Sequence, residues 1–189
     1  MMLIAKPNTS GQSNLRLQIF DQLRYEGPRS AAIEGCKTIA DTYYDCDLEY
    51  EAYNIALECN ISEPNFNYVG SNNGTRRSNT FNSDRITEIV DEWWKTALKG
   101  RNLVNLTPSQ DNTPMIPFLQ MANGKTNRLG CAYEWCVDDY DDLNARPYAL
   151  FVCSYGEEKV RIGRPIYSSG PPCGTCRNRC TFNNRLCKS

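Results

Sequence analysis

The sequence predicts an α+β domain in which helices come first and a small antiparallel sheet follows, with a disulfide-rich tail at the C-terminus. Three observations lead to this prediction. Apolar residues recur at helical spacing in the first hundred residues, two short apolar and aromatic segments follow residue 128, and ten cysteines are spread along 189 residues. That length fits one domain, which we place at residues 14–167, followed by a cysteine-rich, hinge-like tail at residues 168–189.

Three helices are expected before the sheet. The first spans about residues 15–33 and is kinked or split by Gly27-Pro28. The second covers Tyr43 to Cys59, where one apolar stripe runs opposite an acidic face. The third begins at a capping Asn82 or Ser83 and ends at Gly100; it carries Trp93-Trp94, which we interpret as a core anchor.

Polar and proline-containing segments connect these elements. Residues 60–82 are rich in Asn, Ser and Gly and predict a long loop with a short strand near residues 67–70. Residues 103–117 predict an extended, proline-interrupted segment. Residues 116–122 are expected to form a loop or short helix, and Asn123-Gly124 to supply a tight turn with positive φ angles.

The sheet is expected from three segments. Residues 129–136 and 148–155 are short, apolar and aromatic, with cysteines inside each, and are typical of neighbouring strands. Residues 159–167 are expected to add a third strand. The polar loop between the first two strands holds Asp138, Asp139, Asp141 and Asp142. We interpret this acidic cluster as solvated; weak cation binding is the alternative, although its spacing does not follow the EF-hand loop.

The cysteine content indicates an oxidising compartment and therefore a secreted, extracellular protein. A cysteine-only zinc site is the competing interpretation, with Cys173 and Cys176 as its one CxxC unit. Met1 to Ala5 is too short for a signal peptide, so the chain reads as a mature one. The expected disulfide cysteines are Cys36, Cys46, Cys59, Cys131, Cys136, Cys153, Cys173, Cys176, Cys180 and Cys187. Four glycosylation sequons support secretion: Asn8, Asn60, Asn73 and Asn105.

Charge and hydropathy exclude several classes of partner. The net charge is −1, which argues against electrostatic capture of nucleic acid or of an anionic membrane. No apolar run approaches the roughly 20 residues of a transmembrane helix. The chain contains no histidine, which removes the usual general base and the commonest metal ligand together. A Ser-His or Cys-His pair is therefore impossible, whereas Ser-Lys or paired-carboxylate catalysis stays conceivable.

The order of these motifs resembles the CAP superfamily (SCP/TAPS), and within it the activation-associated secreted proteins (Ancylostoma-secreted proteins) of hookworms and other nematodes. The matching segments extend from about residue 15 to residue 189. Two of them are the helix YYDCDLEYEAYNIALEC and the double tryptophan. The first signature block lies at Phe118, Gln120, Met121 and residues 130–132, and the second signature at residues 151–155. The path into the tail runs through Gly163, Pro165, Ile166, Tyr167, Gly170, Pro172 and Cys173. Arg29 fits the arginine of the family's first-helix motif.

The resemblance implies a three-layer α-β-α sandwich and a central cleft. In the family, two histidines and two glutamates converge on that cleft and can hold zinc. The corresponding positions here are Tyr25, Ser71, Thr96 and Pro117, with Ser71 and Thr96 placed to within a residue. None of these side chains is a usual zinc ligand, so we expect a degenerate cleft with no metal, no cofactor and no catalytic residue.

The resemblance also implies bridges and partners. It favours a local Cys131–Cys136 disulfide; within the tail we expect Cys173–Cys180 and Cys176–Cys187, leaving Cys36, Cys46, Cys59 and Cys153 to tie helices to the sheet. The implied function is binding of a host cell-surface or plasma protein, an integrin being one possibility, through the loops at residues 60–82 and 138–145. A carrier of sterol, fatty acid or another small lipid is the alternative, with Ile116, Pro117, Phe118, Leu119 and Met121 lining an apolar groove.

Overall fold

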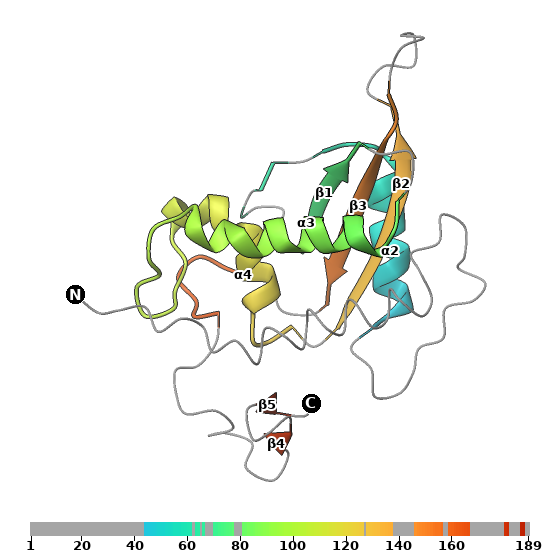
Figure 1. Ribbon diagram of the computed structural model, residues 1–189. Coiled ribbons are helices and arrows are strands. Elements are labelled where there is room, and N and C mark those ends of the chain that lie inside the picture. The colour runs from blue at the N-terminus through green and yellow to red at the C-terminus, as the bar shows by residue number, and fades with distance from the viewer. Residues whose placement is uncertain are drawn as a thin grey trace.

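The computed structural model in Figure 1 describes most of the chain between residues 44 and 166. The described ranges are 44–61, 63–64, 66, 70–77, 81–126, 128–137, 146–156 and 159–166, with two short strands at 180–181 and 186–187. The expected first helix, the acidic cluster at residues 138–142 and most of the tail lie outside these ranges.

A three-stranded antiparallel sheet forms the centre of the described residues. Its strands are β1 (Ser71–Arg76), β2 (Leu129–Cys136) and β3 (Tyr148–Tyr155), in the order β1-β3-β2. Every residue of β3 is buried, because this strand is paired on both edges and covered on both faces. The boundaries of β2 and β3 confirm the strands predicted from their apolar, aromatic pattern.

Helix α2 (Cys46–Leu57) covers one face of the sheet. It begins one turn later than the apolar pattern predicts, because the Asp45 carboxylate caps it by accepting from the backbone N–H groups of Asp47 and Leu48. Ala52 and Ala56 are fully buried and let the helix approach closely. They pack against one face of β2 and β3, at Ala132, Cys136, Tyr148, Leu150 and Val152.

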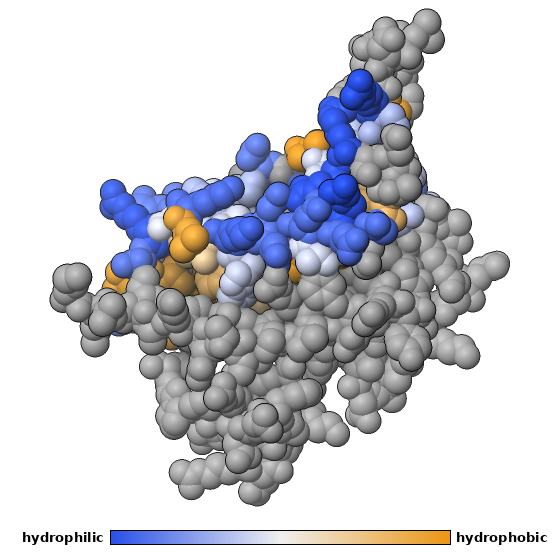
Figure 2. All heavy atoms as spheres, viewed as in Figure 1, coloured by the Kyte–Doolittle hydropathy of each residue, from blue (hydrophilic) through white to orange (hydrophobic). Residues whose placement is uncertain are grey.

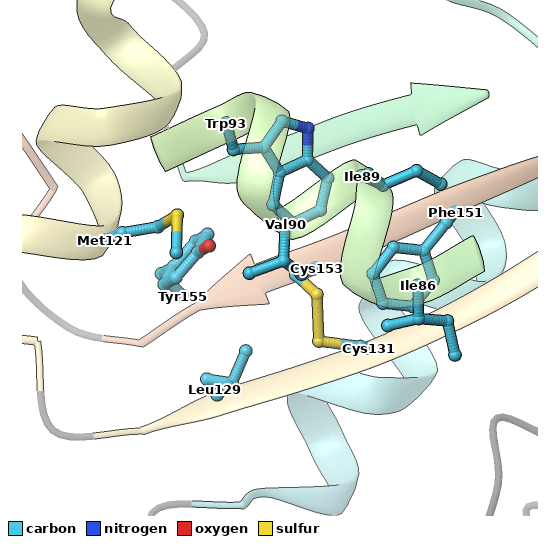
Figure 3. Close-up of a cluster of buried hydrophobic side chains, with 10 residues drawn as sticks. All are labelled: Ile86, Ile89, Val90, Trp93, Met121, Leu129, Cys131, Phe151, Cys153 and Tyr155. Atoms are coloured by element: carbon cyan, nitrogen blue, oxygen red, sulfur yellow. A yellow bond between two sulfur atoms is a disulfide. The ribbon is translucent and has the colours of Figure 1, made fainter. Parts of the chain in front are cut away.

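Helix α3 (Ser83–Lys95) covers the opposite face, as Figure 3 shows. Asn82 caps it by accepting from the backbone N–H of Arg85, so the predicted cap is confirmed. Its apolar stripe meets the alternate residues of β3, since side chains alternate between the faces of a strand. The cluster consists of Ile86, Ile89, Val90, Trp93, Met121, Leu129, Cys131, Phe151, Cys153 and Tyr155. Trp93 stacks on Phe151 with 5.7 Å between ring centroids, which confirms Trp93 as a core anchor.

A third cluster lies where α3 gives way to shorter helices. The 3-10 helices η2 (Thr96–Leu98) and η3 (Gln110–Met115) lead into α4 (Ile116–Ala122). The prediction that residues 103–117 are extended is wrong over η3, whose first turn is fixed by reciprocal hydrogen bonds between Ser109 and Asn112. Met115, Phe118 and Leu119 pack here with Val160 and Ile166.

Two strand predictions differ from the structure. The strand expected near residues 67–70 lies at 71–76, where polar residues pair with β3 from Ser71↔Ser154 to Arg76↔Ala149. Residues 159–166 do not join the sheet. Their backbone bonds go to another loop instead, Gly163 N–H to the Pro108 carbonyl and Ile166 N–H to the Leu106 carbonyl. The third strand is therefore β1.

The turn after α4 also differs from the prediction. Asn123 has φ −66°, and Gly124 is not among the residues with positive φ. The chain nevertheless turns here, because the Thr126 N–H donates to the Asn123 carbonyl over 3.1 Å. Asn-Gly thus ends a helix rather than closing a two-residue hairpin.

The disulfides in the described residues correct one predicted pair. Cys59 is bonded to Cys136 and Cys131 to Cys153, so the Cys131–Cys136 pair is wrong. Residues five apart in a strand lie about 17 Å apart on opposite faces, well beyond the reach of a disulfide. Cys59–Cys136 ties the end of α2 to β2, and Cys131–Cys153 joins β2 to β3 at a Cα–Cα distance of 4.0 Å.

The remaining cysteines are less completely described. Cys46 is disulfide-bonded, and its partner lies outside the described residues. In the tail, β4 (Cys180–Thr181) and β5 (Leu186–Cys187) pair antiparallel, with Cys180 opposite Cys187. The bridges expected for Cys36, Cys173 and Cys176 fall outside the described residues.

Candidate functional site

The positions assigned to the degenerate cleft lie on three elements. Ser71 begins β1, Thr96 begins η2, and Pro117 lies in the first turn of α4. Tyr25, the fourth position, lies outside the described residues. Thr96 and Pro117 are buried, and Ser71 is half-buried.

Thr96 joins the end of α3 to the beginning of α4. Its hydroxyl donates to the Trp93 carbonyl over 2.6 Å, the local bond by which a threonine satisfies the last turn of a helix. The same oxygen accepts the backbone N–H of Phe118 over 3.1 Å. That N–H belongs to the first turn of α4 and has no partner within its own helix. Thr96 and Pro117 therefore belong to one site.

Asn72 provides the third component of this site, which the sequence reasoning missed. It is 3% exposed, and its amide nitrogen donates to the Pro117 carbonyl over 3.0 Å and to the Tyr155 hydroxyl over 3.1 Å. These bonds use both donors of the amide group. Asn72 lies opposite Cys153 in the ladder and therefore shares the face that α3 covers.

Ser71 lies on the other face of the sheet. It pairs with Ser154, and alternate residues of a strand point to opposite faces. The fold thus brings together Thr96 and Pro117 with Asn72, and it separates Ser71 from them. The family resemblance placed the first glutamate position at Ser71 to within one residue. A shift of one residue reaches Asn72, and this was the only sequence signal for Asn72.

The groups that meet in this site are neutral. Burial raises the pKa of the Tyr155 phenol, and the hydrogen bond from Asn72 lowers it by a smaller amount, so the phenol stays protonated at neutral pH. The other groups are an amide, a hydroxyl, a backbone carbonyl and a backbone N–H. We call this set, Asn72, Thr96, Pro117, Phe118 and Tyr155, the neutral network.

A cation lies at the edge of the sheet beside Ser71. The Lys159 ammonium nitrogen is 3.0 Å from where a Cβ on Gly70 would stand, and Gly70 has φ +142°. A lysine here makes the edge unfavourable for a second positive charge. Among the residues that the structure describes, no three His, Cys, Asp or Glu side chains gather closely enough to hold a metal ion.

The apolar side chains considered for a lipid groove lie in α4. Ile116, Pro117, Phe118, Leu119 and Met121 are all buried. Phe118 packs edge-on against Trp94, with 4.9 Å between the ring centroids, and Met121 packs in the α3 cluster. Among the described residues, these side chains are covered by protein, as core packing predicts.

The sequons within the described ranges occupy different surroundings. Asn60 follows α2 and is exposed, although Ser62 of its sequon lies outside the described residues. Asn73 lies within β1 and is half-buried, whereas Asn105 is exposed in a turn. Asn8 lies outside the described residues. Figure 2 shows that the described part of the visible face is mostly hydrophilic, with small separate apolar patches.

A family model described as CAP, the cysteine-rich secretory protein family, matches residues 22–155. A curated relative, the Ancylostoma secreted protein of Ancylostoma caninum, is 27% identical over 158 residues. That match covers 77% of this chain and 35% of the relative, so the chain spans about a third of the relative's length.

Solved structures share the fold. The structure titled NaASP2 with Zn²⁺ has a TM-score of 0.61 at 20% identity and covers 95% of both chains. Na-ASP-1 has a TM-score of 0.60 at 22% identity over 95% of this chain and 47% of its own. The hookworm platelet inhibitor has a TM-score of 0.56 at 22% identity over 99% of this chain and 92% of its own. Within the described residues, no helix is long and apolar enough to cross a membrane.

Proposed function

Since the chain belongs to the cysteine-rich secretory protein (CAP) family, we propose that it is a secreted, non-enzymatic protein of a parasitic nematode that binds a host protein. The observation that carries this proposal is the neutral network. Where the family resemblance implies a cleft with metal ligands, the described chain holds hydrogen-bonded neutral groups that connect β1, β3, η2 and α4. Such a site stabilises a scaffold and offers no reactive group.

Several observations support the absence of a metal at this site. Zinc takes thiolate, imidazole or carboxylate ligands at about 2.0–2.3 Å, and the neutral network supplies none of them. The chain has no histidine, and the Lys159 ammonium stands beside Ser71. The similar structure titled NaASP2 with Zn²⁺ concerns a protein that holds zinc; we propose that this chain has lost that property.

The same composition argues against turnover of a substrate. Without histidine, a serine or cysteine nucleophile lacks its usual base. Ser71, the serine assigned to the cleft, lies on the face away from the neutral network, and Lys159 beside it is exposed.

Secretion and host binding rest on the cysteines and on the relatives. The disulfides Cys59–Cys136 and Cys131–Cys153 suit an oxidising compartment. The curated relative is named a secreted protein. One similar structure is titled a platelet inhibitor, which directs the search for partners toward host plasma and blood-cell surfaces, integrins included. We further propose the complete three-layer sandwich over residues 14–167, within which the family match at 22–155 falls.

A lipid carrier is the weaker alternative. It needs an apolar groove, and the five residues of α4 that were the candidates for lining one are packed inside the protein. A disulfide-tied scaffold with polar loops fits protein recognition better, because little order has to be gained on binding.

The test is capture followed by loop replacement. The chain is used to capture partners from host plasma and leukocyte lysates, and the captured protein is studied by surface plasmon resonance with and without chelator. Because β1 occupies residues 71–76, the replacement covers residues 60–69 and 138–145 only. We expect saturable, stoichiometric binding that chelator leaves unchanged and that the double replacement weakens.

Two outcomes decide against the proposal. Unchanged affinity after both replacements contradicts recognition through these loops. Loss of a substrate at sub-stoichiometric protein contradicts the non-enzymatic assignment. A lipid-extraction assay on the same preparation separates the carrier alternative.

A further inference from the structure

We propose that Asn105 carries an N-linked glycan and that Asn73 does not. This inference rests on the proposed secretion. The two residues make a matched pair, because both sequons end in threonine: Asn73-Gly74-Thr75 and Asn105-Leu106-Thr107. The sequon pattern alone predicts glycosylation at both residues equally, so the difference must come from their surroundings in the fold.

Asn105 lies at the tip of a tight turn. Val104 and Thr107 bridge the turn, with the Thr107 N–H donating to the Val104 carbonyl over 2.9 Å. The two central residues, Asn105 and Leu106, have φ angles of 51° and 59°. Asparagine tolerates this left-handed conformation better than most residues.

The neighbours of Asn105 leave room for a bulky modification. Asn105 is exposed, and the adjacent Val104 is 75% exposed. Leu106 anchors the turn by packing at the edge of the third core cluster. The Thr107 hydroxyl donates to the Asn105 carbonyl over 3.2 Å, so the two polar residues of the sequon are already adjacent. A sugar at this position lies over solvent and covers Val104.

Asn73 is held on both sides within the sheet. Its backbone pairs with Val152, and its carbonyl accepts the indole N–H of Trp93 over 2.9 Å. Its side chain is half-buried on the face that Val152 shares, and Val152 is fully buried. The middle residue of its sequon, Gly74, lies so close to α3 that a methyl group there would press on Ile89.

The chemistry requires an acceptor amide that a transferase can reach. The Asn105 side-chain nitrogen attacks the anomeric carbon of a lipid-linked oligosaccharide. A carbon–nitrogen bond forms, the bond from that carbon to the pyrophosphate oxygen breaks, and the amide loses one proton to a base on the transferase. The lipid pyrophosphate is the leaving group. Bulky glycans of this kind belong to surface loops, which describes Asn105 and not Asn73.

The experiment uses the full chain secreted from insect cells behind a heterologous leader peptide. Peptide-N-glycosidase digestion in ¹⁸O water marks each formerly glycosylated asparagine, and mass spectrometry reads the occupancy of each sequon. We expect most molecules to carry the mark at Asn105 and only a trace at Asn73. The Asn105→Asp variant, whose side chain tolerates the same φ, should lose one glycan, and the Thr107→Ser control should keep it.

Every outcome bears on the inference. Occupied Asn105 with empty Asn73 supports it, and either an empty Asn105 or an occupied Asn73 overturns it. Because the leader imposes secretion, the result is independent of whether a host partner is found. Failure of the host-binding proposal therefore leaves this test intact, and the reverse also holds.

Discussion

The side-chain amide of Asn72 donates to the carbonyl oxygen of Pro117 over 3.0 Å, although 45 residues separate them in the chain. This bond joins the edge strand β1 to the first turn of α4. The second donor of the same amide reaches Tyr155 in the central strand β3. One buried side chain thus fixes the position of three elements around the neutral network.

Asn72→Ala should destabilise the protein by about 1–3 kcal/mol, because a buried carbonyl and a buried phenol each lose a hydrogen-bond partner. The measurement is urea unfolding followed by tryptophan fluorescence. Tyr155→Phe is the matched control, since it removes one hydroxyl and should cost about 1 kcal/mol. In the double variant the losses should be less than additive, since the two residues share a bond. Strict additivity would mean that the Asn72–Tyr155 bond contributes nothing.

Zinc should not bind the neutral network with useful affinity. Metal analysis after dialysis and a calorimetric zinc titration provide the measurement. We expect less than one equivalent of bound metal and no saturable heat, because the network supplies no anionic or imidazole ligand. A stoichiometric site of micromolar affinity that disappears in the Asn72→Ala variant would contradict this expectation.

Glu88 should stabilise the protein at neutral pH and lose that effect in acid. Its hydrogen bonds from Arg85 and then from Arg76, together with their positive charges, lower its pKa below the ordinary 4.5, against a smaller opposing effect of burial. A carboxylate with a lowered folded-state pKa contributes stability above its unfolded pKa and loses it as the pH falls through the folded value. Thermal melts of the parent and Glu88→Gln should therefore differ at pH 7 and converge toward pH 3. High salt should shrink the difference, since both arginine contacts are near solvent.

The two disulfides whose cysteines are both described should be reduced in a fixed order. Cys131 and Cys153 are both buried, whereas Cys59 is half-buried at the end of α2. A thiolate reductant must reach a sulfur atom, so Cys59–Cys136 should open first in a graded dithiothreitol series under native conditions. Alkylation and peptide mapping give the order. Simultaneous opening of both bridges would indicate that global unfolding, and not access, controls their reduction.

Gly130→Ala should be among the most damaging single changes in the described residues. A Cβ there would collide with the backbone nitrogen of Glu49, where the first turn of α2 lies directly on β2. Overpacking against rigid backbone costs roughly 1–3 kcal/mol, and occasionally more. Gly163→Ala is the matched control. No atom lies within 4 Å of its Cβ position, so any loss there reports only its φ of +76°.

The apolar pattern predicted α2, α3, β2 and β3. Residues 129–136 and 148–155 were predicted as strands because short apolar and aromatic segments with internal cysteines fit a covered sheet. Helix α3 was predictable for the same reason, since its stripe and its Asn82 cap agree. The family resemblance agrees with these elements, and so does the match to the family model over residues 22–155.

Strand β1 was not predictable in its place because its sequence, Ser-Asn-Asn-Gly-Thr-Arg, has low strand propensity. Pairing with β3 overrides that preference. Residues 159–166 misled in the opposite direction, since Val160 and Ile166 are buried by the third cluster and not by a sheet. The pairing of Cys131 required knowing which strand lies beside β2, which a local reading of the sequence does not provide.

The neutral network was only half visible in the sequence. Thr96 and Pro117 were assigned to one cleft through the family resemblance. In the structure the Thr96 hydroxyl accepts the N–H of Phe118, the residue after Pro117. Asn72 was missed because the segment around it was interpreted as a loop, where an asparagine carries no particular signal. Its role depends on the face of a strand, and therefore on the register of β1 against β3.

The two described disulfides also determine what a protease can do to this chain. The loop closed by Cys59–Cys136 overlaps the loop closed by Cys131–Cys153, so together they span residues 59 to 153 without interruption. A single cut at any peptide bond in that span leaves the two fragments covalently joined, and bonds 131 to 136 lie inside both loops. On a denaturing gel, a molecule cut once in this span would therefore separate into two fragments only after reduction. A single cut there by a host protease would not release half of the domain.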